Sequence, residues 1–367
     1  MLIAHANLGA VTEAILIAAG SDDNEARIVS DHLVGANLAG HDSHGVGMIP
    51  NYMKNLHEGT LRPNRHAEFL RRDGVIGIVD GGRGYGQVIA REAMEWAIGK
   101  AREAGVAVTA LRNTHHVARV GTYGEQVCAA GLVSLHFVNV NSGPPRVAPF
   151  RGATGRMGTN PVCIAVPGTD ATPAVVLDFA TSKIAIGKVR VAYNEGRQVK
   201  EGTLIDGAGR PTTDPSVLFS NPLGAVLPIG EHKGYGLAMM CELLGGALAG
   251  SNTVQPENSR DVGITNGMVS IVLNPGHFVD VGWFRHEVDQ LVSYLKDTPA
   301  ADPDAPVLVP GEPERQYRAQ RGAAGIPVDD ETWREILEAG ASVGVAADRL
   351  QALARGEGGG SGGSSAG

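Results

Sequence analysis

Apolar residues recur at helical spacing in roughly the first seventy residues of the chain and again beyond residue 283. Helices are predicted over residues 8–20, 21–40 and 49–59. Ser21 is a candidate N-cap followed by acidic residues, and Pro50 lies in the first turn of the third helix, where proline is tolerated. Both ends of the chain therefore favour a helical region.

The middle of the chain changes to an alternation of strands and helices from about residue 74. Strands are predicted at residues 74–80, 106–113, 132–140, 161–167, 174–180 and 267–275. Helices are predicted at residues 86–105, 122–131 and 230–250. Residues 141–230 are rich in Gly, Pro and Thr, which is typical of turns and short strands. The pattern predicts an α/β protein.

The length of 367 residues favours two domains. We expect the two helical ends to form one discontinuous domain, residues 1–72 and 284–355, around a central α/β domain of residues 73–283. The last residues, 356–367, are mostly Gly and Ser, and a disordered tail is predicted there because they offer few apolar groups to bury.

Composition narrows the possible partners. Hydrophobic residues make up 43% of the chain and charged residues 19%, as in ordinary globular proteins. The formal net charge of −8 argues against nucleic acid or an anionic membrane as the main partner. The sequence shows neither an apolar run of membrane-spanning length nor a signal peptide, so a cytoplasmic location is expected. Cys128, Cys163 and Cys241 lack paired spacing and are expected to be buried, inert thiols.

The stretch "ALRNTHHVARVG" places two histidines side by side where a strand ends. Neighbouring side chains diverge there, so His115 and His116 cannot share one role. One of them suits proton transfer at neutral pH, and the other is expected to be structural. Arg119 adds a cation that pairs either with a substrate carboxylate or with an acidic residue of the protein.

The turn "HDSHG", residues 41–45, gathers two histidines, a carboxylate and a hydroxyl. One reading is a solvated helix cap, in which Asp42 or Ser43 bonds free backbone N–H groups. A metal site built on His41, Asp42 and His44 is the weaker reading, because the ligand spacing matches no zinc motif.

The stretch "DGGRGYGQ", residues 80–87, resembles a dinucleotide fingerprint but has the spacing G-x-G-x-G. A tight turn is the better interpretation. Further along, "GEHKGYG" places His232 and Lys233 at the start of a predicted helix, where backbone N–H groups and cations favour a phosphate.

Several motifs occur together and in order: "AGHDSHGVGMIPNY", "LRNTHHVARVG", "LDFATSKIAIGKVRVA", "IDGAGRPTTDP" and "EHKGYGLAMMCELLGGALAG". From about residue 5 to residue 350 the chain resembles the type 2 malate/L-lactate dehydrogenase family. The resemblance implies oxidoreduction between a 2-hydroxy acid and its 2-oxo acid with NAD or NADP. It also implies an α+β fold that is not Rossmann-like, with a largely antiparallel central sheet flanked by helices, and a homodimer.

The resemblance assigns roles to individual residues. His116 is implied as the proton acceptor or donor, with Ser43 and His44 beside the substrate and nicotinamide. The implied cofactor contacts are His44, Ala118, Arg119, Val120, Val176, Leu177, Asp178, Phe179, Ala180, His232, Lys233, Asn266, Gly311, Glu312, Pro313 and Glu314. The implied substrate contacts are Ser43, Met48, Arg119, Thr159 and Asn160.

Met48 departs from the family pattern, which often has arginine there to bind the substrate carboxylate. We expect Arg119 to take that role, and an apolar Met48 favours an acid without a second carboxylate. A metal-dependent hydrolase or metal-binding protein, using His41, Asp42, His44, His115 and His116, is the alternative function. A dinucleotide-binding module without catalysis is a third possibility, and no metal is expected for the leading reading.

Overall fold

In the computed structural model, residues 1–258 and 263–357 are described. The chain divides into two compact units: Met1–Asn64 with Pro313–Gly367, here called the helical unit, and Arg65–Glu312, here called the sheet unit. The boundaries fall at residues 64 and 312 instead of the expected 72 and 284, because residues 68–73 form a strand of the sheet and residues 281–296 form a helix of the sheet unit. From residue 358 onward, the predicted tail lies outside the described residues.

The helical unit forms from both ends of the chain, as separate stretches of sequence. Its helices are α1 (His5–Ala18), α2 (Asp23–Leu38), α3 (Ile49–His57), α10 (Asp330–Ser342), α11 (Ala347–Arg355) and most of α9 (Glu312–Ala324). Strand β1 (Leu2–Ile3) pairs antiparallel with β12 (Ile326–Pro327), which ties the two ends of the chain together. The N-cap of α2 is Asp22, which accepts from the Glu25 N–H at 2.8 Å, and not Ser21, whose hydroxyl donates to the Glu25 carboxylate.

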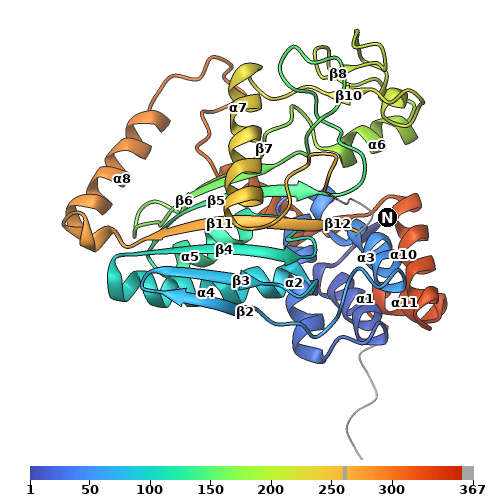
Figure 1. The fold of residues 1–367 in the computed structure, drawn as a ribbon, viewed down its shortest axis with the longest axis horizontal. Coiled ribbons are helices and arrows are strands. Elements are labelled where there is room, and N and C mark those ends of the chain that lie inside the picture. Colours follow the sequence, from blue (N-terminus) through green and yellow to red (C-terminus); the bar gives the residue numbers. More distant parts are fainter. Residues whose placement is uncertain (259–262, 358–367) are drawn as a thin grey trace, which may run out of the picture. The chain divides into compact units, whose positions relative to one another are not determined.

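A seven-stranded sheet forms the centre of the sheet unit, with the strand order β2-β3-β4-β11-β5-β6-β7. Its strands are β2 (Glu68–Asp73), β3 (Ile76–Asp80), β4 (Val106–Thr114), β5 (Val133–Asn141), β6 (Pro161–Val166), β7 (Val175–Ala180) and β11 (Thr265–Leu273). The β3 and β4 pair is parallel, and all other neighbours in this sheet are antiparallel. The mixed α/β class predicted from the sequence is confirmed, whereas β2 was not predicted (Figure 1).

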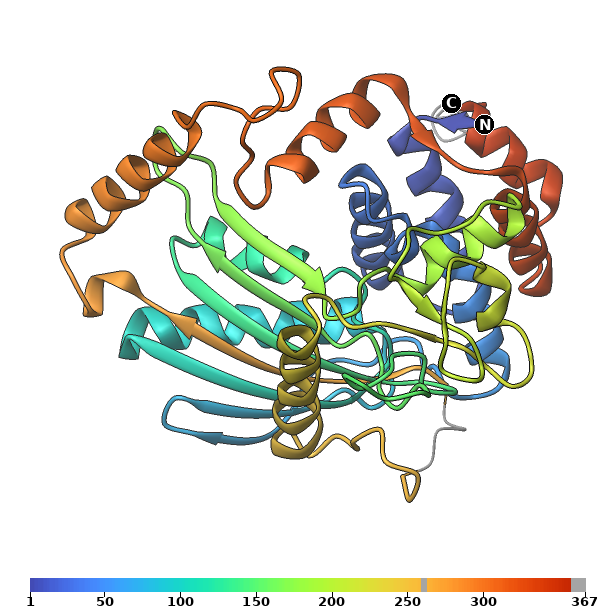
Figure 2. The same ribbon diagram turned by 90° about the horizontal axis from the view of Figure 1, so that it is seen from above.

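Helices cover both faces of this sheet. Helices α4 (Gly86–Ala104) and α5 (Gly121–Ala129) bury one face in an apolar core that includes Met94, Leu111 and Met268. On the other face, the predicted helix of residues 230–250 is α7 (His232–Cys241) continued by the π-helical η4 (Glu242–Leu248), which crosses the strands in Figure 2. Gly245 allows this close packing, since a Cβ there would lie 2.8 Å from the Asn139 backbone nitrogen.

Two further segments complete the sheet unit. A small sheet of β8 (Leu204–Ile205), β9 (Pro211–Thr212) and β10 (Ala225–Val226) packs near α6 (Ile186–Asn194), and α8 (Val281–Lys296) has no buried residue. The three cysteines are free and buried, as predicted. Within the part of the chain that the structure describes, no helix is long and apolar enough to cross a membrane.

Candidate active site

Strand β4 carries a bulge immediately before the histidine pair. Asn266 of β11 pairs with Thr114 while Met268 pairs with Leu111, so β4 contains one extra residue between these pairs. Asn113 lies in the bulge with φ of 50°, a left-handed conformation that asparagine tolerates better than most residues. The bulge ends the ladder and redirects the chain at the point where His115 and His116 follow.

The glycine-rich turn of residues 80–86 packs against this redirected segment. The Gly84 carbonyl accepts from the His115 N–H at 3.1 Å, and the Gly81 N–H donates to the Arg112 carbonyl at 2.9 Å. A Cβ on Gly86 would lie 2.4 Å from the His116 carbonyl oxygen and 2.5 Å from that of His115. The glycines therefore form the tight turn expected from their spacing, and that turn serves to hold the histidine segment.

The two histidines have different environments. His115 is 1% exposed, and burial, with the nearby Arg83 cation as a smaller cause, lowers its pKa to about 3. At neutral pH His115 is therefore uncharged and shielded from solvent. His116 is only partly buried. Of the two, His116 has the access that exchange of a proton with a small molecule requires.

Buried polar groups fix the backbone after His116. Asn266 is 1% exposed; its Oδ1 accepts from the Val117 N–H at 2.9 Å and its Nδ2 donates to the Asn139 carbonyl at 3.1 Å. The Tyr123 hydroxyl donates to the Val117 carbonyl at 2.6 Å. Asn266 was expected to contact the cofactor, but its carboxamide is committed to the backbone on both sides, so it positions the segment that carries His116.

The side chain of Arg119, which was expected to bind a substrate carboxylate, lies beside two carboxylates of the protein. Its side chain is 1% exposed and lies 2.9 Å from Glu125 Oε1 and 3.8 Å from Asp178 Oδ2. The same Asp178 oxygen accepts from the Gly121 N–H at 2.8 Å. A buried guanidinium paired with two carboxylates is not available to bind a substrate carboxylate. Arg119 instead anchors the start of α5 to strand β7.

Four of the expected cofactor segments adjoin one another. The Arg119–Asp178 pair joins residues 118–120 to strand β7. The Val176 N–H of β7 donates to the carbonyl of Pro310, the residue before Gly311, at 3.3 Å. The Ile229 N–H, three residues before His232, donates to the carbonyl of Thr181, which follows β7. Strand β7 is the last strand of its sheet. His232 and Lys233 are exposed at the start of α7. The arrangement offers the backbone N–H and C=O groups of an edge strand together with a helix start that carries His232 and Lys233. Such a helix start suits the phosphates of a dinucleotide.

The expected substrate contact Asn160 has a structural role as well. It is fully buried with φ of 32°; its Nδ2 donates to Glu242 at 2.8 Å and its Oδ1 accepts from the Val140 N–H at 3.1 Å. Its carboxamide therefore ties β5 to the helical layer above the sheet and is not free for a substrate. Thr159 is half-buried, and its carbonyl accepts from the Thr181 hydroxyl at 2.9 Å.

In the helical unit, contacts divide the "HDSHG" turn into two parts. His41 Nε2 lies 3.1 Å from the Glu314 carboxylate, and both Asp42 oxygens accept from Arg321. Ser43 Oγ and His44 Nδ1 lie 2.9 Å apart, within hydrogen-bond distance, and both residues are partly buried. His41 and Asp42 therefore hold the turn, and the Ser43–His44 pair keeps a hydroxyl and an imidazole together.

The remaining predicted residues lie near the unit boundary or in the helical unit. Glu312 uses its carboxylate within the sheet unit, accepting from Lys296 Nζ at 2.7 Å and from the Val309 N–H at 2.9 Å. Pro313 and Glu314 belong to the helical unit. Met48 is half-buried at the end of the turn η2 (Val46–Met48).

A metal centre gains no support from the geometry. Among residues 1–258 and 263–357, no three or more His, Cys, Asp or Glu side chains form a group that could hold a metal ion. The residues that sequence analysis missed are Asp80, Arg83 and Asn113, which join the glycine-rich turn to the bulge. Arg83 and Ala118 share the left-handed conformation of Asn113, with φ of 63° and 56°. Such backbone strain collects at functional sites, but no sequence pattern marks it for Arg or Ala.

Comparisons with known proteins identify the family of the chain. The sequence profile of the malate/L-lactate dehydrogenase family matches residues 3–337. The chain is 46% identical to hydroxycarboxylate dehydrogenase B of Escherichia coli strain K12 over 93% of this chain and 94% of that protein. It is 40% identical to an L-lactate dehydrogenase of Cupriavidus necator, over 87% of this chain and 91% of that one.

The solved structure of sulfolactate dehydrogenase from Methanocaldococcus jannaschii has a similar fold. It superposes with a TM-score of 0.82 at 32% identity and covers 95% of this chain and 99% of its own. Sequence profile, relatives and fold thus agree over nearly the whole length, and the chain belongs to the malate/L-lactate dehydrogenase family.

Proposed function

We propose that this protein is an NAD- or NADP-dependent oxidoreductase that interconverts a 2-hydroxy acid and its 2-oxo acid, with His116 as the proton acceptor and donor. The observation that carries the proposal is the difference between the two adjacent histidines. His115 is sealed in the fold as a neutral side chain, whereas His116 is partly exposed on a backbone held from both sides. The relatives that this chain matches are dehydrogenases of such acids.

In oxidation, His116 takes the proton of the C2 hydroxyl as the C2 hydride leaves, and in reduction it returns that proton. The fixed bonds of Val117 to Asn266 and Tyr123 limit how far the His116 backbone moves. When bound, the nicotinamide cofactor supplies or accepts the hydride. We assign Ser43 and His44 to the same reaction, with the hydroxyl and imidazole as hydrogen-bond partners of the substrate.

The proposed cofactor contacts are the backbone of residues 118–120 and 176–180, with His232, Lys233 and Gly311. Their fit rests on the exposed cations at the start of α7 and on the last strand of the sheet. Helix starts favour phosphate through their backbone N–H groups, and Lys233 adds a positive charge. The side chains of Arg119 and Asp178, which form an ion pair at 3.8 Å, would support these contacts.

The proposed substrate is a monocarboxylic 2-oxo acid with an apolar side chain. Met48 provides no cation at a position where many family members have arginine, and Arg119 is buried in ion pairs. A second carboxylate would therefore lose its hydration without a partner charge in return.

We also propose a homodimer, with α8 in the contact between two copies. Trp283, Leu291 and Tyr294 are 54%, 59% and 75% exposed on a helix without a buried residue. A solvent-exposed stripe of large apolar side chains is typical of an interface. Light scattering should give twice the 38.1 kDa mass of the chain, and Leu291→Glu should shift the protein towards monomer.

A panel of 2-oxo acids tested with NADH and with NADPH examines the function directly. Turnover of pyruvate or phenylpyruvate, followed by nicotinamide absorbance and unchanged by a metal chelator, is the expected result. If no acid is turned over with either cofactor, or if activity requires an added metal, the proposed function is wrong.

A further inference from the structure

Strands β3 and β4 form the parallel pair of the large sheet, so both strands end at the same edge. Asp80 is the last residue of β3 and pairs with Arg112 of β4. The glycine-rich turn that follows β3 therefore lies against the bulge and the histidine segment at the end of β4. Asp80 is at the junction of these two parts of the chain.

The Asp80 carboxylate bonds to both parts. Its Oδ1 accepts from the Gly82 N–H of the turn and from Asn113 Nδ2 of the bulge, both at 2.8 Å. Its Oδ2 lies 3.8 Å from Arg112 Nε in a looser ion pair, and the Asp80 side chain is 23% exposed. One oxygen atom thus links the turn after β3 to the bulge in β4.

Two backbone hydrogen bonds continue this link to the histidines. The Arg83 N–H donates to the Asn113 carbonyl at 2.8 Å, and the His115 N–H donates to the Gly84 carbonyl at 3.1 Å. Arg83 and Asn113 both have the left-handed backbone conformation, which persists where several bonds fix it. The turn therefore fixes the chain directly before His116.

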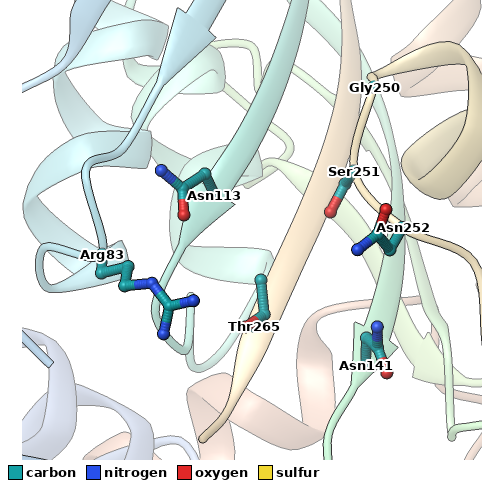
Figure 3. A pocket seen from close by; sticks show the side chains of 7 residues that line it. All are labelled: Arg83, Asn113, Asn141, Gly250, Ser251, Asn252 and Thr265. Atoms are coloured by element: carbon teal, nitrogen blue, oxygen red, sulfur yellow. The ribbon is translucent and has the colours of Figure 1, made fainter. Parts of the chain in front are cut away.

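A small polar cavity borders the bulge on its other side. Its volume is about 150 Å³, and Arg83 and Asn113 lie next to each other in its wall, together with residues of β5, β11 and the chain that follows η4 (Figure 3). A side chain in the wall of a cavity lacks packing contacts on that side. The position of Asn113 therefore depends on hydrogen bonds, and Asp80 provides the one to its carboxamide.

We propose that Asp80 is a positioning residue for the reaction assigned to His116. It fixes the turn and the bulge, and through them the place at which the His116 imidazole meets the C2 hydroxyl. The inference rests on the proposed function. The role belongs to the acceptor Oδ1 and not to the charge, because both short bonds end on that atom, while the ion pair with Arg112 is long and partly exposed.

The test compares Asp80→Ala, which removes both bonds, with Asp80→Asn, which keeps the Oδ1 acceptor and removes the charge. Asp206→Ala is the matched control, since the Asp206 side chain is 24% exposed and its Oδ2 also faces an arginine, Arg210. Asp206 Oδ1 accepts from the Ala208 and Arg210 N–H groups at 2.9 Å, so its bonds stay within the turn between β8 and β9. The two carboxylates differ in their link to the histidine segment.

Asp80→Ala should lower kcat roughly 10- to 100-fold, the effect of an imprecisely placed catalytic group, with the KM of the acid and the Kd of the cofactor unchanged. The pH dependence of kcat should keep its midpoint, because position is lost and not a charge beside the substrate. Asp80→Asn and Asp206→Ala should keep the wild-type kcat, although Asp206→Ala should lower the melting temperature as Asp80→Ala does.

Amide hydrogen exchange measures the positioning without turnover. In Asp80→Ala the Arg83 and His115 N–H groups should exchange roughly tenfold faster or more, because their hydrogen bonds depend on the shape of the turn. Both rates should stay at the wild-type level in Asp80→Asn and in Asp206→Ala.

Asn113→Gly is the second variant, to be used if Asp80→Ala does not fold. Glycine accepts the left-handed conformation of residue 113 and removes the carboxamide that Asp80 holds. A lower kcat and faster exchange at His115 are expected here too, each smaller than in Asp80→Ala because the bond from Gly82 to Asp80 remains.

The inference is overturned if the folded variant, Asp80→Ala or Asn113→Gly, keeps the wild-type kcat and exchange rates. It is also overturned if Asp206→Ala lowers kcat equally, which indicates only a loss of stability, or if Asp80→Asn is as slow as Asp80→Ala, which assigns the effect to charge. If the wild type turns over no acid, the proposed function fails. Faster exchange in Asp80→Ala then still supports Asp80 as the anchor of the histidine segment, and unchanged exchange overturns it.

Discussion

The turn at residues 41–45 and the segment at residues 112–121 each carry two histidines, and in each pair one histidine is tied to the fold. In the helical unit, His41 is held near the surface by the Glu314 carboxylate, with 27% of its side chain exposed. In the sheet unit, His115 is held by burial, and a cation rather than a carboxylate lies nearby. The second histidine of each pair, His44 or His116, stays partly exposed.

Burial separates the two histidines of the sheet unit, whereas in the helical unit both are partly buried and a contact with Glu314 distinguishes His41. A single polar contact at a partly exposed side chain contributes about 1 kcal/mol or less, so His41 holds its turn only loosely. Burial of a neutral imidazole removes it from acid–base chemistry near neutral pH altogether. The four predictions below test this contrast.

The largest expected effect is on stability against pH. Burial lowers the pKa of His115 to about 3 and that of His136, which is fully buried between the Ser134 and Ser270 hydroxyls, to about 4. In the unfolded chain both histidines titrate near pH 6.5. Below that pH the unfolded state therefore binds more protons than the folded state, and the free energy of unfolding falls. The fall ends where the histidines of the folded state titrate, at about pH 4 and pH 3. Between pH 7 and pH 5 the free energy of unfolding should fall by about 4 kcal/mol, about 2 from each histidine.

Urea unfolding at several pH values measures this change. His115→Asn and His136→Asn should each lose about half of the pH dependence, whereas His41→Gln should keep it. A wild-type protein equally stable at pH 7 and pH 5 would show that these histidines are not held neutral.

The next effect separates the adjacent histidines in turnover. His116→Asn should lower kcat roughly a hundredfold or more, because a general acid–base group is lost, while the cofactor still binds. His115→Asn should lower the melting temperature but leave the kcat of the folded fraction near that of the wild type. If the two variants exchange these results, the assignment of the proton acceptor is reversed.

Two glycines of α4 test the support of the histidine segment. Gly86→Ala places a Cβ 2.4 Å from the His116 carbonyl oxygen and should cost about 1–3 kcal/mol of stability, with a lower kcat because that carbonyl must shift. Gly99 has no atom within 4 Å of its added Cβ, so Gly99→Ala should stabilise the helix by about 0.5–1 kcal/mol. Chemical denaturation measures the stability of both variants, and steady-state kinetics measures their kcat. If Gly86→Ala changes neither stability nor kcat, the glycine-rich turn does not support the histidine segment closely.

The smallest effect concerns the neighbourhood of the Ser43–His44 pair. Met48→Arg should shift the ratio of kcat/KM values towards oxaloacetate and away from phenylpyruvate about tenfold, since a new cation would pair with the second carboxylate. Met48→Leu, which keeps the volume and adds no charge, should leave the ratio unchanged. A wild-type preference for oxaloacetate over phenylpyruvate would contradict the proposed substrate class.

Much of the local structure could be predicted because it depends on neighbours in the sequence. The periodicity of residues 86–105 predicts α4, and the alternation at residues 106–113 predicts β4, each within one residue of the observed ends. The π-helical continuation of α7 could not be predicted, because Gly245 and Gly246 pack on backbone and side-chain atoms of β5 and β11, which are distant in sequence.

By itself, the sequence determined the α/β class and the family and indicated candidate site segments, since motif order and apolar spacing are properties of the chain. Only the tertiary structure decided which polar side chains have partners. Asn266, Asn160 and Arg119 match expected contacts in sequence, yet each is bonded to groups far along the chain. Arg83 and Asn113 lie in motifs that gave them no role, yet they line a cavity, because a bulge and a glycine turn bring them together. Desolvation and hydrogen bonding act across space, and for this reason the roles of polar residues depend on the fold.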